Sequence, residues 1–356
     1  MRGFGILLVV LAMGCGEESG DEDAGPPPPS VDSGPAGVDA GPPPRDGMVG
    51  LPDTGTFDAG DTTDAGYPDA GPPGDAGPPP IVPITFIGAG DIADCSALGL
   101  AGIIRDPHEY TADLFAHYAP DTPIFALGDL VYSNGTELEY RTCYSRAWGM
   151  HAARTYPVPG NHDYNTDDAQ PYHDFFGGRF GAPRRGWWSR DLGDWHIVGL
   201  DSNCGDVPGL CDTDSEQLNW LRADLAASTA RCTLAMWHHP RWSSDRAGDN
   251  PSSGYFMDEL YAAGADLVLV GHAHNYERFP PMNPSGEIDL VGGMRQFVVG
   301  TGGASLRPLE IMSAQSELFY DRTHGIMELT LHADRYEWSF IPTEGSFTDT
   351  GMELCH

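Results

Sequence analysis

Apolar runs long enough for one β-strand each recur through the part of the chain that begins near residue 81. Five of these runs predict short buried strands, at residues 84–89, 124–127, 156–159, 232–237 and 265–270. Polar residues lie at the C-terminal end of each run, so each strand would present them at that end. In open α/β sheets this edge is where ligands bind.

Other segments have the periodicity of helices. The leucine spacing predicts a helix over residues 214–227, with Asp214 or Ser215 as its N-cap. A second helix is expected over residues 255–263, directly before the strand at 265–270.

Two pairs of alternating segments predict β-hairpins. The first pair is 187–191 with 196–200, and the second is 325–332 with 336–341. Because helices would lie outside and strands inside, the pattern predicts an α/β protein with a layered αββα sandwich and mixed central β-sheets.

The N-terminal part of the chain has a different composition. Residues 1–15 contain an arginine, an apolar run and a Gly-Cys pair, which is typical of a bacterial lipoprotein signal with cleavage before Cys15. The alternatives are a plainly cleaved secretory signal and a membrane anchor, for which the run is too short. Residues 16–80, rich in Asp, Ala, Gly and Pro, predict a disordered linker. Residues 81–356 would then form the catalytic domain.

The charge of the chain limits its partners. The chain has a net charge of −33 and contains no lysine. Nucleic-acid binding normally needs a basic face, so we expect no nucleic-acid partner, and membrane contact only through a lipidated Cys15. The charge also disfavours highly anionic substrates at long range, unless bound cations invert the field locally.

The cysteine count is typical of an exported protein. Besides Cys15, the chain has six cysteines, an even number that suits disulfides. Cys204 and Cys211 are close enough in sequence to close a small loop, whereas pairing among the other four stays open. The alternative, a thiolate zinc site, lacks a Cys-x-x-Cys pair.

The polar clusters at the predicted strand ends have the composition of a two-metal site. They are Gly90-Asp91, Gly128-Asp129 with Tyr132, Gly160-Asn161-His162-Asp163, Trp237-His238-His239-Pro240 and Gly271-His272-Ala273-His274. Such a site needs a bridging carboxylate, further oxygen and nitrogen ligands, and open positions for water and substrate. A single Gly-Asp pair is most often only a turn. The recurrence of such clusters after successive strands predicts a dinuclear site.

His272 and His274 are the strongest pair of ligand candidates. They follow an apolar strand and are one residue apart, so at a strand end both imidazoles would lie on one side, within reach of adjacent ions. The alternative is a pair of hydrogen-bonded core histidines. Because imidazole is a frequent metal ligand, we interpret them as ligands.

Together these motifs resemble the calcineurin-like metallophosphoesterases and, within them, the purple acid phosphatases. Many members of the wider family have a histidine two residues after the first aspartate, a position held here by Ala93. The purple branch has a tyrosine three residues after the second aspartate, as Tyr132 follows Asp129. The resemblance covers most of residues 84–342.

The resemblance implies a place for each metal ligand. It puts Asp91, Tyr132 and His274 on the first ion, Asn161, His238 and His272 on the second, and Asp129 between them as a bridge. A phenolate beside carboxylates suits ferric iron. An amide oxygen and two imidazoles suit a divalent iron, zinc or manganese ion.

Four further residues have expected roles. The resemblance places His162 beside the substrate phosphate, where it would orient the ester or protonate the leaving oxygen. Asp163 would hold that imidazole or a neighbouring loop. His239 is either an outer-shell or substrate-side residue or a packing residue, and Arg246 is a candidate phosphate contact.

The predicted function is that of an exported phosphoesterase, either a lipoprotein anchored at Cys15 in the cell envelope or a secreted protein. It would hydrolyse small-molecule phosphate esters by attack of a metal-bound hydroxide. A divalent-metal phosphodiesterase or nucleotide hydrolase is one alternative, and a surface-tethered binding module without catalysis is another. The sequence indicates neither the physiological substrate nor the oligomeric state.

Overall fold

The computed structural model of the chain describes residues 82–95, 105–180, 185–207, 209–246 and 248–356. All of them belong to one compact unit, Pro73–His356. The predicted signal peptide, the predicted lipidation site Cys15 and the whole predicted linker lie outside the described residues. Within the described ranges, no helix is both long enough and apolar enough to cross a bilayer.

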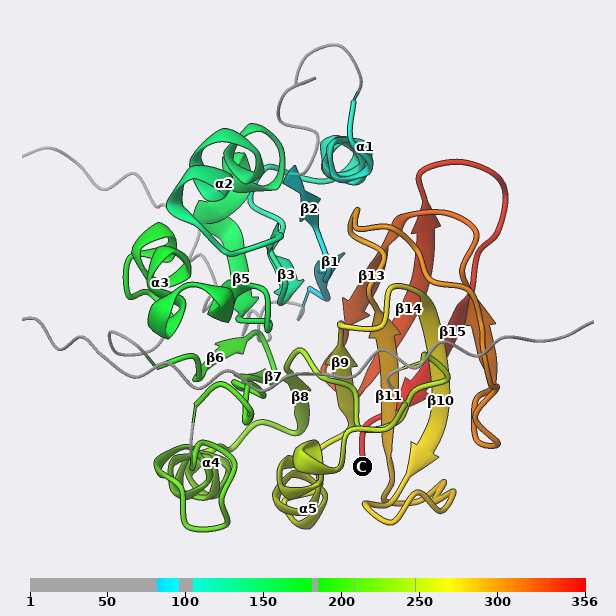
Figure 1. Cartoon of the computed structure of the whole chain (residues 1–356). Helices are drawn as coiled ribbons and strands as arrows, with labels where there is room; N and C mark the ends of the chain where they lie inside the picture. Colours follow the sequence, from blue (N-terminus) through cyan, green and yellow to red (C-terminus); the bar gives the residue numbers. More distant parts are fainter. Residues whose placement is uncertain (1–81, 96–104, 181–184, 208, 247) are drawn as a thin grey trace, which may run out of the picture. The chain divides into compact units, whose positions relative to one another are not determined.

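Two large β-sheets form the centre of the unit (Figure 1). The six-stranded sheet has the order β15-β14-β13-β1-β3-β5. Its parallel strands are β1 (Ile84–Ala89), β3 (Ile124–Leu127) and β5 (Thr155–Val158). The antiparallel strands are β13 (Gly325–Leu331), β14 (Arg335–Pro342) and β15 (Thr350–Leu354).

The seven-stranded sheet has the order β12-β10-β11-β9-β8-β7-β6. Four neighbouring strands run parallel: β7 (Trp195–Gly199), β8 (Cys232–Met236), β9 (Leu267–Val270) and β11 (Met294–Val299). The others are β6 (Trp188–Leu192), β10 (Tyr276–Met282) and β12 (Leu318–Tyr320). A separate short pair joins β2 (Ala93–Asp94) to β4 (Val131–Tyr132).

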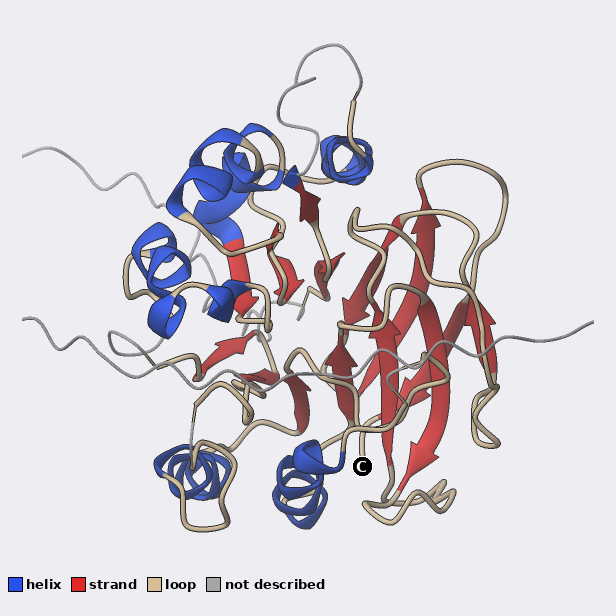
Figure 2. Cartoon of the chain, in the orientation of Figure 1, coloured by secondary structure: helices blue, strands red, loops and turns tan. Residues whose placement is uncertain are grey.

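Helices flank the two sheets (Figure 2). The α-helices are α1 (Pro107–Asp113), α2 (Glu137–Thr142), α3 (Gln170–Phe176), α4 (Glu216–Ala227) and α5 (Gly254–Ala262). Short 3₁₀ helices span Leu114–His117, Tyr144–Arg146, Trp148–Arg154, Asp163–Asn165, Asp167–Ala169 and Pro251–Ser253.

The central strands bury both faces, and their side chains alternate between two cores. In β9, Leu267 and Leu269 join the core between the sheets, which also contains Phe86 and Leu329 of the opposite sheet. Val268 and Val270 of β9 join the core beneath α4 and α5. This arrangement confirms the predicted layered α/β fold with mixed sheets.

Differences from the predicted elements are confined to their ends. The strand expected at 265–270 begins at Leu267, because the Asp266 carboxylate instead accepts hydrogen bonds from the backbone N–H groups of Thr233 and His356. Helix α4 begins at Glu216 and has Ser215 as its N-cap, since the Ser215 hydroxyl accepts from the backbone of the first turn.

Three disulfides join the six cysteines of this unit. Cys204–Cys211 confirms the predicted small loop. The two pairings that the sequence left open are Cys95–Cys143 and Cys232–Cys355. The second ties β8 to the C-terminal residues, and these bonds leave no thiolate pair for zinc among the described residues.

Candidate metal centre

The residues after the parallel strands converge on one place, and the phenol of Tyr132 lies at the centre of the first group. Its Oη atom is 2.8 Å from Oδ1 of Asp91, 2.9 Å from Oδ2 of Asp129 and 3.1 Å from Nε2 of His274. The His274 Nε2 atom is also 3.3 Å from Oδ1 of Asp91. Four side chains from three segments of the chain therefore direct oxygen or nitrogen atoms at one another.

A second group is built around the amide of Asn161. Its Oδ1 atom lies 3.2 Å from Nε2 of His238 and 3.0 Å from Nδ1 of His272. The two groups meet at Asp129, whose Oδ2 atom is 3.3 Å from Nε2 of His238. All seven predicted ligands are therefore brought together, in the two sets that the sequence predicts, with Asp129 between them.

The backbone at this site is strained where the ligands begin. Asp91, Asp129 and His272 have φ angles of 58°, 49° and 68°, in the left-handed region that non-glycine residues seldom adopt. Such conformations persist where surrounding contacts enforce them, and they gather at functional sites. Here they turn the side chains back over the strand ends.

His272 and His274 differ from their prediction in one respect. They do not continue a strand: they lie in a tight turn after β9, where the N–H of Ala273 donates to the carbonyl of Gly271 at 2.8 Å. Because of this turn the two imidazoles point at different groups, His272 toward Asn161 and His274 toward Tyr132.

Glycine is required at two positions where the backbone passes close to the site. A Cβ atom on Gly160 would lie 2.2 Å from the backbone nitrogen of Asp129 and 2.3 Å from its Oδ1 atom. Gly128 has a φ of 79°, and a Cβ there would lie 2.5 Å from Nδ1 of His238. These contacts explain why glycine precedes the ligands in both motifs.

Backbone carbonyls orient two of the imidazoles. The Nδ1–H group of His238 donates to the carbonyl of Leu127 at 2.7 Å, and that of His274 donates to the carbonyl of Ser305 at 2.8 Å. Since a carbonyl only accepts, a proton is fixed on Nδ1 of each ring, and the Nε2 atom is the one that faces the cluster. Metal-binding histidines are commonly oriented in this way.

The electrostatics of the cluster favour cation binding. Asp91 and Asp129 are buried at 0% and 1% exposure. Burial alone would raise the pKa of both carboxyls, but the neighbouring His274 and His238 hold both pKa values below the usual range. Burial lowers the pKa of His238, yet Asp129 raises it overall to about 9. Burial and the charge of His238 lower the pKa of His272 to about 4.

The donor atoms of these residues fit metal ions. Without metal, the positive charge of a protonated imidazole offsets part of the negative charge of the two buried carboxylates. Bound metal ions would offset that charge more completely. The donors comprise carboxylates, a phenol, an amide oxygen and imidazoles, all of which are ligands for first-row transition metals. Asp91, Asp129 and His238 are close enough to hold one ion, as are His238, His239 and His272.

His162 lies at the open side of the cluster, and Asp163 lies beneath it. The Nδ1 atom of His162 is 2.7 Å from the carbonyl of Ser133, and its Nε2 atom is 4.0 Å from Oδ2 of Asp129. Asp163 is buried and accepts hydrogen bonds from the Gly160 N–H and the Tyr140 hydroxyl. Of its two expected roles, Asp163 therefore holds the loop. Burial, followed by the charge of Asp129, raises its pKa to about 7.

His239 lies beside the second group. Its ring centre is 4.6 Å from that of His272 and 4.9 Å from that of His238, and its Nδ1 atom is 2.9 Å from the Ser202 hydroxyl. Burial and the charge of His238 hold the pKa of His239 well below its usual value, so the ring is neutral. His239 therefore lies next to two candidate ligands, and its outer-shell or substrate-side role stays a prediction.

An arginine other than the one that the sequence indicated contacts the candidate ligands. Arg246 is exposed in the wall of a neighbouring cavity, and its role as a phosphate contact stays a prediction. Arg307 instead lies against the site: its Nη1 atom is 3.4 Å from the carbonyl of His272, and its backbone N–H donates to the carbonyl of His274. No local motif marks Arg307, because it follows the last ligand by more than thirty residues.

Comparison with known proteins identifies the family. The profile of the calcineurin-like phosphoesterase family matches residues 84–276, more than half of the chain. The chain is 26% identical over 243 residues to Purple acid phosphatase 18 of Arabidopsis thaliana, covering 62% of this chain and 50% of that protein. It is 29% identical to Purple acid phosphatase 15 of the same plant, covering 60% and 45%.

A solved structure supports the fold. The purple acid phosphatase PPD1 from yellow lupin (Lupinus luteus) seeds superposes with a TM-score of 0.63 at 18% identity, covering 75% of this chain and 53% of that chain. The chain spans about half the length of the curated relatives it matches. The profile match contains all seven predicted ligands, and the chain therefore belongs to the calcineurin-like phosphoesterase family.

Proposed function

We propose that this protein is a dinuclear metal-dependent hydrolase of small-molecule phosphate esters, similar to the purple acid phosphatases. One observation carries the proposal: Asp129 lies between two groups of donor atoms, 2.9 Å from Tyr132 in one and 3.3 Å from His238 in the other. A carboxylate in this position is what a pair of adjacent cations requires as a bridge.

The residues divide into two ligand sets. Asp91, Tyr132 and His274 would hold the first ion and Asn161, His238 and His272 the second, with Asp129 shared. The first set suits ferric iron, because two carboxylates and a phenolate are hard, anionic donors. The second, with an amide oxygen and two imidazoles, suits divalent iron, zinc or manganese. When bound, the cations supply Lewis-acid activation of the ester and lower the pKa of water.

His162 is the residue proposed to handle the proton of the leaving group. The Ser133 carbonyl holds the proton of its Nδ1 atom, so the Nε2 atom is the one that faces the cluster. From there a protonated Nε2 can donate to the ester oxygen as the P–O bond breaks. The ring remains partly exposed at the mouth of the site, where an ester has access to it.

The proposed location is outside the cytoplasm. Three disulfides in one unit favour an oxidising compartment, and the N-terminal residues have the composition of a lipoprotein signal. The protein would then be held in the cell envelope through Cys15, or be secreted if the signal is simply cleaved.

Replacing Asp129 with Asn tests the proposed function. We expect metal-loaded protein to hydrolyse a generic aryl phosphate, and Asp129→Asn to lower kcat/KM more than about 100-fold, because a bridging ligand loses its charge. Asp258→Asn, at an exposed position on α5, is the matched control and should retain activity. An aryl phosphodiester assayed in parallel separates the diesterase alternative.

Two outcomes would contradict this proposal. Metal-replete wild-type protein that turns over neither ester would favour the binding module. Equal loss of activity in Asp129→Asn and Asp258→Asn would mean that the assayed activity does not depend on the bridging position.

A further inference from the structure

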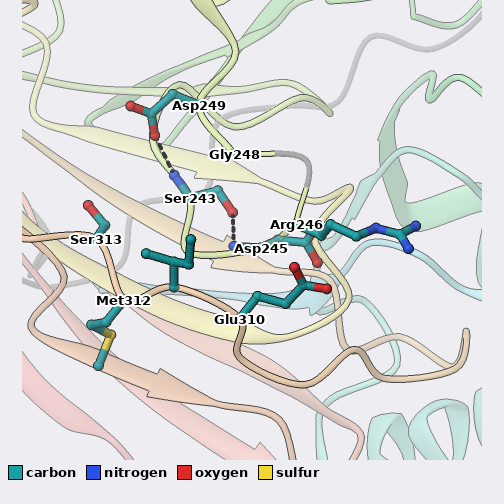
Figure 3. A pocket seen from close by; sticks show the side chains of 9 residues that line it. Ser243, Asp245, Arg246, Gly248, Asp249, Glu310, Met312 and Ser313 are labelled. Carbon is teal, nitrogen blue, oxygen red and sulfur yellow. Dashed lines mark hydrogen bonds between the residues drawn. The ribbon is translucent and has the colours of Figure 1, made fainter.

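A cavity of about 350 Å³ shares a neighbour with the candidate metal centre, because Arg307 contacts both its lining residue Asp245 and the carbonyl of His272. Its walls are two loops, residues 243–246 with 248–249 on one side and residues 310–313 on the other, which face each other (Figure 3). Both loops continue segments of the site, since the first begins shortly after His239 and the second shortly after Arg307. Its volume is within the range of small-molecule sites.

Arg307 connects the cavity to the ligands. Its Nη1 atom is 3.4 Å from the carbonyl of His272 and 3.8 Å from Oδ1 of Asp245, a cavity residue whose side chain is buried. The Arg307 side chain is itself 36% exposed. One partly exposed cation therefore lies between the metal centre and the cavity, and a guanidinium can bind two phosphate oxygens at once.

Hydrogen bonds hold the two loops of the cavity in place. The backbone N–H of Ser313 donates to the Ser244 hydroxyl at 2.8 Å, and the Ser244 N–H donates to the buried Glu277 at 2.9 Å. The backbone N–H of Ser243 donates to Asp249 at 3.0 Å (Figure 3). These bonds join the two loops and β10, so the cavity is a built feature of the fold.

The lining of the cavity combines apolar surface with negative charge. Ile311 and Met312 are 80% and 50% exposed, so they offer hydrocarbon contact to a bound molecule. Asp245, Asp249 and Glu310 outnumber the single arginine of the lining, Arg246. Such a lining favours an organic group without negative charge.

We propose that Arg307 binds the phosphoryl group of the substrate and that the cavity holds its alcohol part. The substrate class is then a phosphate monoester whose alcohol part is small and neutral or cationic. This inference rests on the proposed function. It disfavours nucleoside polyphosphates and anionic sugar acids, whose charge would face the cavity carboxylates.

Three aliphatic monoesters test the inference: O-phosphoethanolamine (cationic), glycerol 1-phosphate (neutral) and 3-phosphoglycerate (anionic). We expect kcat/KM to fall in that order, with about 10-fold between the first and the last, because a charge a few ångströms away in a solvated site changes binding several-fold. Glu310→Lys should lower this ratio at least about 5-fold. Asp258→Lys, the same charge change on α5, should leave the ratio as in the wild type.

Arg307 is tested through the phosphoryl group, which all three esters share. Arg307→Met should raise KM for all of them by a similar factor of about 10 and raise the inhibition constant of inorganic phosphate, with unchanged metal content. Arg307→Lys should recover part of the loss.

The failures of the two proposals are distinguishable. Wild-type protein that is active on an aryl phosphate but prefers 3-phosphoglycerate, or a ratio equal in Glu310→Lys and Asp258→Lys, overturns the inference and leaves the function standing. An unaltered phosphate inhibition constant in Arg307→Met overturns the role of Arg307. Metal-replete protein inert on every ester removes the proposed function and this inference with it.

Discussion

Tyr132 has surroundings unlike those of an ordinary tyrosine. Its hydroxyl contacts two buried carboxylates and an imidazole. Without a cation, burial and the charges of Asp129 and Asp91 raise the pKa of Tyr132 well above its usual value. A trivalent cation bound here would reverse this preference, because it would attract the phenolate more strongly than the carboxylates oppose it. The proposed metal and the ionised phenol therefore depend on each other.

Replacing Tyr132 with Phe should change the colour of the protein. We expect iron-loaded wild type to show a visible tyrosinate-to-iron charge-transfer band, and Tyr132→Phe to lose it. Tyr140→Phe is a suitable control, because it removes another buried hydroxyl, one bonded to Asp163 outside the ligand set. Absorption spectra of the three proteins at equal iron content decide the matter. A band that survives in Tyr132→Phe would exclude the phenolate as an iron ligand.

The sequence indicated where the proposed ligands would gather better than it indicated which groups support them. Asp91, Asp129 and His238 follow apolar strands, so the local pattern alone indicated where they would lie. The carbonyl of Ser305, which orients His274, was not predictable, because every residue has a carbonyl and only the folded chain selects one. Arg307 escaped prediction for a similar reason: its contacts join segments that are distant in sequence.

At the level of elements, burial of both strand faces explains why the parallel strands could be predicted. Strands β8 and β9 bury both faces, so they form continuous apolar runs bounded by polar residues. The short 3₁₀ helices, such as Trp148–Arg154, were not predicted. Their residues pack against the core through tertiary contacts and have no helical spacing of their own.

A buried histidine joins β6, β7 and α4. His196 contacts Asp191 through Nδ1 and Asp224 through Nε2, each at 2.8 Å. Burial lowers the pKa of His196, but the two carboxylates raise it overall. Because the folded pKa exceeds the unfolded value of about 6.5, the ion pairs contribute fully below that pH. Their contribution is lost as pH rises through the folded pKa.

His196→Gln should therefore destabilise the protein more in acid than in alkali. We expect a loss of about 1–2 kcal/mol in unfolding free energy at pH 5.5 and a smaller loss at pH 9, since charge-assisted hydrogen bonds exceed neutral ones in strength. Denaturant unfolding at the two pH values measures the difference, and His117→Gln, on the exposed surface, is the control. An equal loss at both pH values would show that folding does not raise the pKa of His196.

At the level of the whole molecule, the fold buries negative charge at the candidate metal centre, where bound metal ions would offset it. The chain carries a net charge of −33, and two of its carboxylates are fully buried beside a phenol. Burying such groups is costly unless they are paired. Metal binding should therefore stabilise the fold as well as supply the chemistry.

The most direct measurement of the central claim is anomalous X-ray diffraction from crystals of metal-loaded protein. The account predicts two anomalous peaks about 3.5–4 Å apart, with Asp129 between them, Tyr132 at one and Asn161 at the other. A single peak, or peaks away from Asp129, would contradict it.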